Sequence, residues 1–373
     1  MARTAPPRRR AFSLTAAIAA VLLVALVLRT ANVLLLVFLA VLLAIYLRAV
    51  SDGLVTRMRV PGPIALVAAA VLSLGILAGI GIVIAPAVVE QVRELLANLS
   101  GYITDLNRNI NALIQSVPFL ARSMGRIDLP GMVASSLSDV IRFLQGLIVP
   151  YLKSGLELVI EGVAVGVMGI YLAAYPTVYT EGVVALIPPA RRPLARRILA
   201  DLGITLRAWI AGQIAAMALL GLLTTLGLWL LGVPYALAFG VFAGVAAIVP
   251  FFGTLASTAL PALFALTVGG LSKALAVTVL GIVVHLIEAN VVAPMVMERQ
   301  VKLPPVLTIA GVLLMGRLFG TIGLLVAVPV LAVCLVLVRH LLLGEVYGDP
   351  VAAAGRAEEA PVEPAMPAVI NRG

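Results

Sequence analysis

The chain has 373 residues, of which 62% are hydrophobic and only 12% are charged, and its formal net charge is +9 at pH 7. Soluble globular domains carry about twice that share of charged residues, so the composition excludes a soluble domain and predicts an all-α multi-pass membrane protein. The basic excess fits the positive-inside rule for membrane loops and does not indicate nucleic-acid binding. The single cysteine, Cys334, can form no internal disulfide.

Residues 1–85 are predicted to form N-terminal transmembrane helices. Apolar runs over about 11–28, 33–50 and 63–85 are each of a length to cross a bilayer, and a tight connection is predicted at 29–32. The loop at 48–59 carries three arginines against one acid. Because cytosolic loops are enriched in Arg and Lys, this loop and the N-terminus are predicted to be cytosolic.

Residues 86–153 differ from the rest, because charges of both signs return and apolar positions become periodic. The steps of three and four predict amphipathic helices on the extracytoplasmic side. Two interpretations stay open: these faces pack on each other or on the membrane surface, or they form a seam between subunits of a homo-oligomer. The periodic positions are Val92, Leu95, Leu99, Tyr102, Leu106, Asn109 and Leu113, then Val133, Leu137, Val140, Leu144 and Leu147.

Residues 154–207 are predicted to hold a fourth transmembrane helix, at about 155–176, and a basic cytosolic loop. Residues 208–340 are predicted to form a transport core with further spans at about 208–231 and 271–297, giving about six in all. Two other apolar segments, 235–268 and 303–338, are each about 35 residues long. A straight helix of that length would measure roughly 50 Å, against about 30 Å of bilayer hydrocarbon.

Both long segments are interrupted near their centres, the first at 249–254 and the second at 316–321. Shifted by 67 positions, six of the twelve residues from 243 to 254 are identical between them, including a Phe-Gly-Thr triplet at each interruption. We therefore predict two re-entrant helical hairpins in an inverted repeat, which is typical of transporters. If both segments cross fully instead, residues 298–302 lie outside the cell. Residues 341–373 are predicted to be a disordered cytosolic tail.

Polar residues in these segments form the predicted substrate- or ion-binding site, because ionisable groups are costly in lipid. Glu288 can pair with Arg317, either as a structural clamp or as a site that binds a proton or cation. His285 lies on the same helix face as Glu288 and either relays a proton or only hydrogen-bonds. Hydroxyls after each interruption either bind a small polar ligand or bond back to their own helix. The full predicted set is Pro250, Gly253, Thr254, Ser257, His285, Glu288, Asn290, Arg317, Gly320 and Thr321.

Enzyme motifs are missing from the sequence, which has no HExxH, GxSxG, Walker A or CxxC pattern. The chain is therefore predicted not to be an enzyme. No cofactor and no metal is predicted, and coupling to protons or sodium is left open. The predicted partners are a small polar solute or cation and the lipid bilayer.

Several runs in fixed order resemble a known family. They are Gly-Val-Pro-Tyr-Ala-Leu from residue 232, Ile-Val-Pro-Phe-Phe-Gly from 248, Ile-Glu-Ala-Asn-Val-Val-Ala-Pro from 287, Leu-Phe-Gly from 318 and Ala-Val-Pro from 327. These runs resemble the autoinducer-2 exporter (AI-2E) family of bacterial membrane transporters, most strongly over 205–340. Trp209 to Gln213 resembles the aromatic-x-x-Gly-Gln stretch of that family.

The resemblance implies a homo-oligomeric transporter of the bacterial inner membrane. It implies export of the small signal autoinducer-2, or else exchange of sodium or lithium for protons; a non-transporting membrane scaffold is the remaining alternative. The family often has Gln where His285 stands and His where Pro304 stands. These departures bear on the coupling ion and not on the fold.

Overall fold

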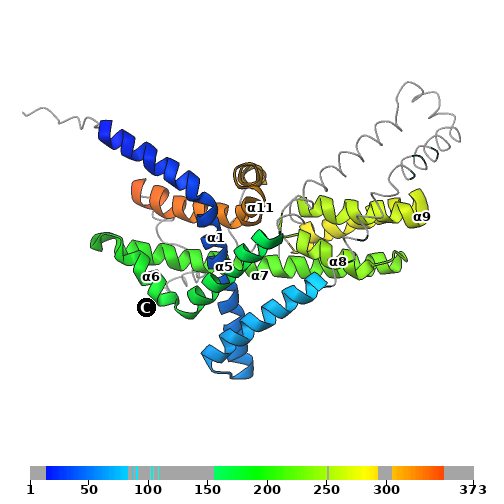
Figure 1. The fold of residues 1–373 in the computed structure, drawn as a ribbon, viewed down its shortest axis with the longest axis horizontal. Helices are drawn as coiled ribbons and strands as arrows, with labels where there is room; N and C mark the ends of the chain where they lie inside the picture. The colour runs from blue at the N-terminus through cyan, green and yellow to red at the C-terminus, as the bar shows by residue number, and fades with distance from the viewer. Residues whose placement is uncertain are drawn as a thin grey trace, which may run out of the picture.

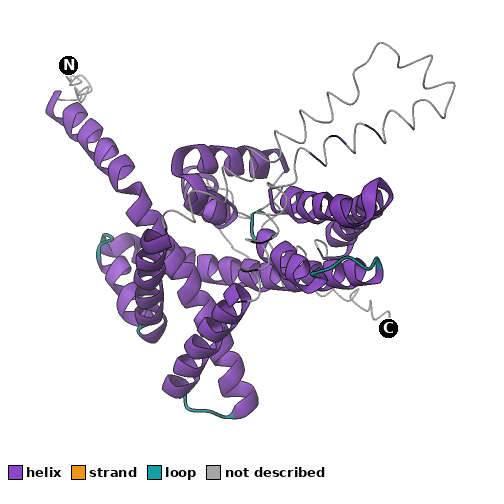
Figure 2. Cartoon of the chain, turned by 45° about the vertical axis from the view of Figure 1, so that its right-hand side comes forward, coloured by secondary structure: helices purple, strands orange, loops and turns teal. Residues whose placement is uncertain are grey.

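The computed structural model describes residues 14–82, 155–249, 252–292 and 305–347, with a few single residues between 86 and 108. Within these ranges every regular element is a helix and none is a strand (Figure 2). Five of the described helices are long and apolar enough to cross a membrane, or six if one bent pair is a single span. The predicted all-α multi-pass class is therefore confirmed. Apart from those single residues, the predicted amphipathic segment at 86–153 lies outside the described residues.

The first described helix, α1 (Leu14–Met58), runs for 45 residues without a break (Figure 1). The prediction of two spans joined at 29–32 is wrong, because that stretch holds neither Gly nor Pro and nothing in it breaks a helix. The Thr30 hydroxyl instead donates to the Leu26 carbonyl, one turn back in the same helix, at 2.8 Å. The predicted cytosolic N-terminus depended on the basic residues 1–10, which lie outside the described residues.

A helix at Gly62–Ile82 and α5 (Gly155–Ala174) pack on the second half of α1. Small side chains fill the shared core and let the helices approach closely, as is common between membrane helices. The Arg48 guanidinium donates to the Ala173 carbonyl at 3.0 Å and so ties α1 to the end of α5. The buried members of this core are Ala44, Leu47, Ala69 and Ala173.

The sequence did not predict the next helix, α6 (Pro176–Ala185), which is bent by 87° from the helix before it. Proline suits the first turn of a helix, since its missing N–H would have no partner there. After the 3-10 turn η1 (Pro189–Arg191) the chain folds back, and Glu181 forms an ion pair with Arg196 of the following helix at 2.8 Å. Part of the predicted basic loop is therefore helical.

The helix α7 (Arg192–Leu230) packs backbone to backbone on the short helix α8 (Ala236–Ala246). A Cβ added to Gly240 or to Gly244 would lie 2.6 Å from a carbonyl oxygen of α7, and Gly221 faces the same seam. Such contact requires glycine on α8, and the Gly-x-x-x-Gly spacing at 240–244 is the pattern that close-packed membrane helices use.

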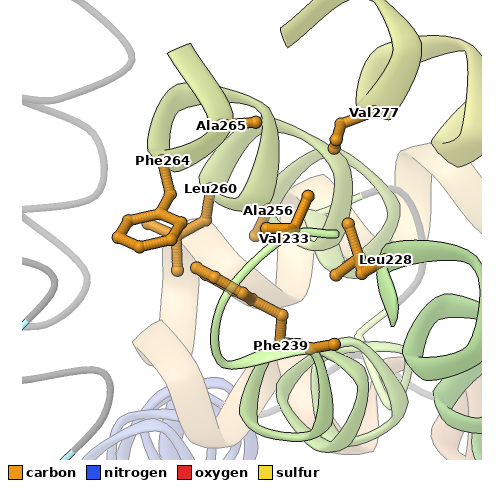
Figure 3. Close-up of a cluster of buried hydrophobic side chains, with 9 residues drawn as sticks. Leu228, Val233, Phe239, Ala256, Leu260, Phe264, Ala265 and Val277 are labelled. Carbon is orange, nitrogen blue, oxygen red and sulfur yellow. The ribbon is translucent and has the colours of Figure 1, made fainter. Parts of the chain in front are cut away.

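The chain reverses after α8, and the first half of α9 (Phe252–Ile287) returns along it (Figure 1). At the turn, Gly253 lies so close to the Ala246 backbone that a Cβ would overlap it. Deeper in the pair, the rings of Phe239 and Phe264 face each other with centroids 5.3 Å apart (Figure 3). The buried cluster around them comprises Leu228, Val233, Ala236, Phe239, Ala256, Leu260, Phe264, Ala265 and Val277. We call α8 with the first half of α9 the first hairpin.

A second reversal within α9 lies at Gly270, which adopts φ 70° and ψ −169°, a conformation open to glycine and strained for other residues. The second half of α9 then runs back beside the first half. Gly281 packs so closely on Thr258 that a Cβ there would overlap the threonine side chain. These four helical stretches, from α7 to the end of α9, form one closely packed bundle.

The helix α11 (Pro305–Leu337) is also broken by a glycine, Gly320, with φ 60° and ψ −139°. Length and hydropathy alone would make 306–346 one span. The contacts show otherwise: a Cβ on Gly311 would lie 2.5 Å from Leu331, and one on Gly323 would overlap the Met315 carbonyl. Residues on either side of Gly320 therefore face each other, so the chain folds back there. We call α11 the second hairpin.

The two hairpins are anchored at opposite ends of α7. Lys273, beside the reversal at Gly270, donates to the Gly232 carbonyl just past the C-terminal end of α7 at 3.0 Å. His340 belongs to the π-helical segment η3 (Val338–Val346) that follows the second hairpin, and its Nε2 lies 2.7 Å from Asp201 near the N-terminal end of α7. The segment η3 extends to Val346, past residue 340, where the predicted transport core ends.

Candidate functional site

The two hairpins reach the same stretch of α7. The Gln213 amide donates to the Ala247 carbonyl, at the turn of the first hairpin, at 3.0 Å. Val326, shortly after the turn of the second hairpin, is fully buried in a cluster that includes Leu206 and Ile210. The turn of the first hairpin and the stem of the second hairpin thus lie against neighbouring turns of one helix. Gln213 was not among the predicted site residues, although a side-chain amide within an apolar helix is itself a signal of a specific contact.

The glycines and hydroxyls predicted for the site lie at or near these turns. Gly253 is buried at the first turn, whereas the neighbouring Thr254 is exposed. Gly320 forms the second turn, and the adjacent Thr321 is half-buried. Pro250 lies outside the described residues.

Three predicted residues form a continuous hydrogen-bonded chain. Ser257 Oγ lies 3.2 Å from His285 Nε2, and His285 Nδ1 lies 2.9 Å from Glu288 Oε2. Ser257 is on the first half of α9, and His285 lies near the end of the second half. The hydrogen-bonded chain therefore joins the first hairpin to the helix that follows it. The exposed fraction of Ser257 is 5%, which places the serine end of the chain inside the protein.

Glu288 owes its position to a change in helix type. At Glu288 the α-helix widens into the π-helical turn η2 (Glu288–Val292), a feature that is frequent at functional sites. The i,i+3 spacing brings the carboxylate back to the imidazole of His285. Asn290 lies within the same turn, but its amide donates to the Leu286 carbonyl at 2.7 Å and is thus committed to its own helix.

The predicted ion pair of Glu288 with Arg317 is not formed among the described residues. Glu288 contacts His285, and Arg317 is exposed three residues before the turn at Gly320. The structure therefore brings together Ser257, His285 and Glu288, and leaves Arg317 apart from them. An i,i+3 partner on the same helix needs no tertiary placement, which favours the histidine contact over the distant arginine.

A narrow crevice, with room for about one water molecule, opens beside the serine end of the hydrogen-bonded chain. It lies between α7 and the two halves of α9. Its lining is mostly apolar and contains no Asp, Glu, Lys or Arg. Its polar lining residues are Thr224, Ser257, Thr258 and His285. The sequence did not predict Thr224 as part of this lining, because its position there depends on how α7 packs against α9.

The arrangement is suited to holding and moving a proton. A neutral imidazole has one donor and one acceptor nitrogen, so it can link a carboxylate to a hydroxyl. The order serine, histidine, carboxylate also occurs in hydrolases. Here, however, Ser257 is buried and its hydroxyl is also 3.0 Å from the Thr254 carbonyl, which holds it against its own helix. Among the described residues no cluster of His, Cys, Asp or Glu could hold a metal ion.

Helices of membrane-spanning length, broken by glycines and carrying buried polar links, define a multi-pass helical membrane protein of the transporter type. The model of the AI-2E family transporter matches residues 14–343, and the chain belongs to this family. The resemblance predicted from the sequence runs is thereby confirmed.

Individual relatives are similar to the chain over different lengths. The candidate transport protein YueF of Bacillus subtilis (strain 168) is 26% identical over 290 residues, or 74% of this chain and 75% of YueF. The candidate transport protein sll0060 of Synechocystis sp. is 26% identical over 281 residues, covering 74% of this chain and 78% of that protein. The candidate transport protein YrrI of B. subtilis is 30% identical over 157 residues, and the match spans only 44% of YrrI.

Proposed function

We propose that the chain is a secondary transporter that moves a small polar solute or signal, of the autoinducer-2 kind, out across the bacterial inner membrane. The observation that carries the proposal is the pair of hairpins that open at opposite ends of α7 and reach its middle. This arrangement supports two re-entrant hairpins of inverted orientation, with unwound turns at membrane depth where a solute site can form.

The lengths of the helices support the re-entrant interpretation. The two helices of the first hairpin, Ala236–Ala246 and Gly253–Leu266, are both too short to count as spans. At 1.5 Å per residue α8 measures about 16 Å, roughly half of the bilayer hydrocarbon. Along α7, Gln213 lies about 18 Å from Asp201 and about 28 Å from Gly232 by the same rise. The first turn therefore meets α7 well inside its length.

Orientation follows from charge. The N-terminal end of α7 is rich in arginine, and we place it in the cytosol together with the C-terminus, since His340 contacts Asp201 at that end. The base of the first hairpin then faces outward. The homo-oligomer remains a proposal that depends on the periodic positions at 86–153.

Cysteine labelling tests the hairpin topology. In a Cys334→Ala background, a cysteine at the exposed Ser272 should react with an impermeant reagent added outside, because Lys273 next to it is tied to the outer end of α7. Cysteines at 298–302 should be protected from the same reagent. The reverse pattern, with 298–302 labelled and Ser272 protected, means that the segments cross fully and the hairpin topology is wrong.

Proteoliposome flux tests the function. The purified chain, reconstituted with a pH-sensitive dye inside, should move solute under an imposed gradient. The second candidate, sodium or lithium exchange for protons, is favoured by the His285–Glu288 contact and predicts cation-driven proton movement that Glu288→Gln abolishes. Glu181→Gln is the matched control, because Glu181 lies in an exposed ion pair far along the chain. A chain that moves neither solute nor protons is a scaffold, and both proposals fail.

A further inference from the structure

The hydroxyl of Ser257 has one proton and two acceptors within reach. The carbonyl of Thr254 lies 3.0 Å away, and Nε2 of His285 lies 3.2 Å away. On its other side, His285 places Nδ1 2.9 Å from the Glu288 carboxylate. Because a hydroxyl can donate to one acceptor only, the position of its proton depends on whether Nε2 is itself protonated.

Two hydrogen-bond arrangements fit this geometry, and they differ by one proton. In the first, Nδ1–H donates to the Glu288 carboxylate, the Ser257 hydroxyl donates to Nε2, and the histidine–glutamate pair carries a net charge of −1. In the second, an added proton on Nε2 is donated to Ser257 Oγ, and the hydroxyl proton turns to the Thr254 carbonyl. The pair is then an imidazolium and a carboxylate, with a net charge of zero.

The stretches of α7 and α9 beside the pair carry no other titratable group; further along α7, Arg207 is paired with Asp52 and Asp201 contacts His340. Residues 217–230 of α7 and residues 252–272 of α9 contain no Asp, Glu, Lys, Arg, His, Cys or Tyr. Lys273 lies three turns away along its helix and is held by the Gly232 carbonyl. In apolar surroundings the neutral, proton-loaded pair costs less to bury than the anionic one.

We propose that His285 and Glu288 together hold one coupling proton, and that Ser257 turns its hydroxyl between His285 and Thr254 according to whether that proton is bound. The proposal rests on the transporter function proposed above, since it supplies a proton to which that transport can be coupled. The proton reaches Nε2 through the crevice, which His285 and Ser257 both line. Proton binding thus changes a hydrogen bond between the first hairpin and the helix that follows it.

Nitrogen NMR of the imidazole tests this directly, because the chain has only two histidines. The full chain, labelled with ¹⁵N-histidine and held in lipid nanodiscs, gives two sets of ring signals, and His285→Gln identifies which set is lost. The His285 signals should show one ring N–H, on Nδ1, in the proton-free form and two ring N–H groups in the proton-loaded form. His340→Gln, which removes the other set, provides the confirming assignment.

Variants separate the contributions. Glu288→Gln should reduce the share of doubly protonated His285 at a fixed pH, because the imidazolium loses its counter-charge. Ser257→Ala should change that share by less, since the serine hydroxyl is a partner of Nε2 in both forms. Thr278→Val is the matched control, because the Thr278 hydroxyl lies on the same helix but donates to the Ala274 carbonyl, so that share should not change.

A His285 ring that keeps a single N–H at every pH at which the protein stays folded, or a doubly protonated share that Glu288→Gln leaves unchanged, overturns the proposal. These readings require no gradient and no transport. If His285 gains its second N–H as expected but the protein shows no flux, the proton site is supported and the transport function is contradicted. Flux without titration removes the proton site alone.

Discussion

Gly253→Val should abolish flux in proteoliposomes and destabilise the first hairpin. A side chain at this position overlaps the carbonyl oxygen and the carbonyl carbon of Ala246, and both atoms belong to the backbone. No rotamer change relieves such a clash, so the turn must open. Overpacking of this kind costs about 1–3 kcal/mol in a core where side chains can give way, and a backbone clash lies at or above the upper end. Opening the turn also moves Ser257, one helical turn on, away from His285.

Gly162→Ala is the control for this substitution. Gly162 is exposed on α5, and a Cβ there meets nothing within 4 Å. Alanine is the better helix former by about 1 kcal/mol, so the control should be as stable as the parent or slightly more so. The measurement is unfolding in mixed detergent micelles alongside flux at equal reconstituted protein. A Gly253→Val chain with parental stability and flux would show that the turn does not pack as described.

Phe239→Ala should be the most destabilising single truncation in the bundle. Phe239 is 1% exposed, and its ring packs on Phe264 at the centre of the cluster that joins α8 to α9 (Figure 3). In soluble proteins such truncations cost about 3–5 kcal/mol, part of it from transfer to water and part from the cavity. In a bilayer the transfer part shrinks because the competing solvent is lipid, and about 2–3 kcal/mol should remain from lost packing.

The control for Phe239→Ala is Trp229→Ala on the adjacent helix. Trp229 is larger, but 69% of it is exposed, so its truncation leaves no cavity. Its effect on the free energy of unfolding should stay below about 1 kcal/mol. Phe239→Leu fills part of the space and should recover part of the loss. Equal effects of the phenylalanine and tryptophan truncations would contradict the packing described for the hairpin.

The sequence signals that succeeded were local. The Phe-Gly-Thr triplets mark both turns because glycine tolerates the close approach at Gly253 and the positive φ at Gly320. The i,i+3 spacing placed His285 beside Glu288 without any knowledge of the fold. The continuous helix through residue 30 was missed because two apolar runs around a short polar patch resemble two spans. The helix α6 was missed because a basic, proline-containing stretch resembles a loop.

The contacts that sequence reasoning missed link segments far apart in the chain. Ser257 and His285 are 28 positions apart, and their contact exists only because α9 reverses at Gly270. The Glu288–Arg317 pairing was a guess from charge, and charge alone does not say which helices are neighbours. The Gly-x-x-x-Gly pattern at 240–244 was readable in the sequence, but the partner helix α7 was not.

The glycine seam between α7 and α8 limits how the molecule can change shape. Carbonyl oxygens of α7 occupy the space that a Cβ on Gly240 or Gly244 would need, so the two helices are in direct backbone contact. This contact resists sliding of one helix along the other. We therefore expect the first hairpin to move together with α7. We further expect any outward-to-inward rearrangement to occur where α7 meets α1 and the second hairpin, because there the contacts are made by side chains such as Leu206 and Val326 and not by backbone.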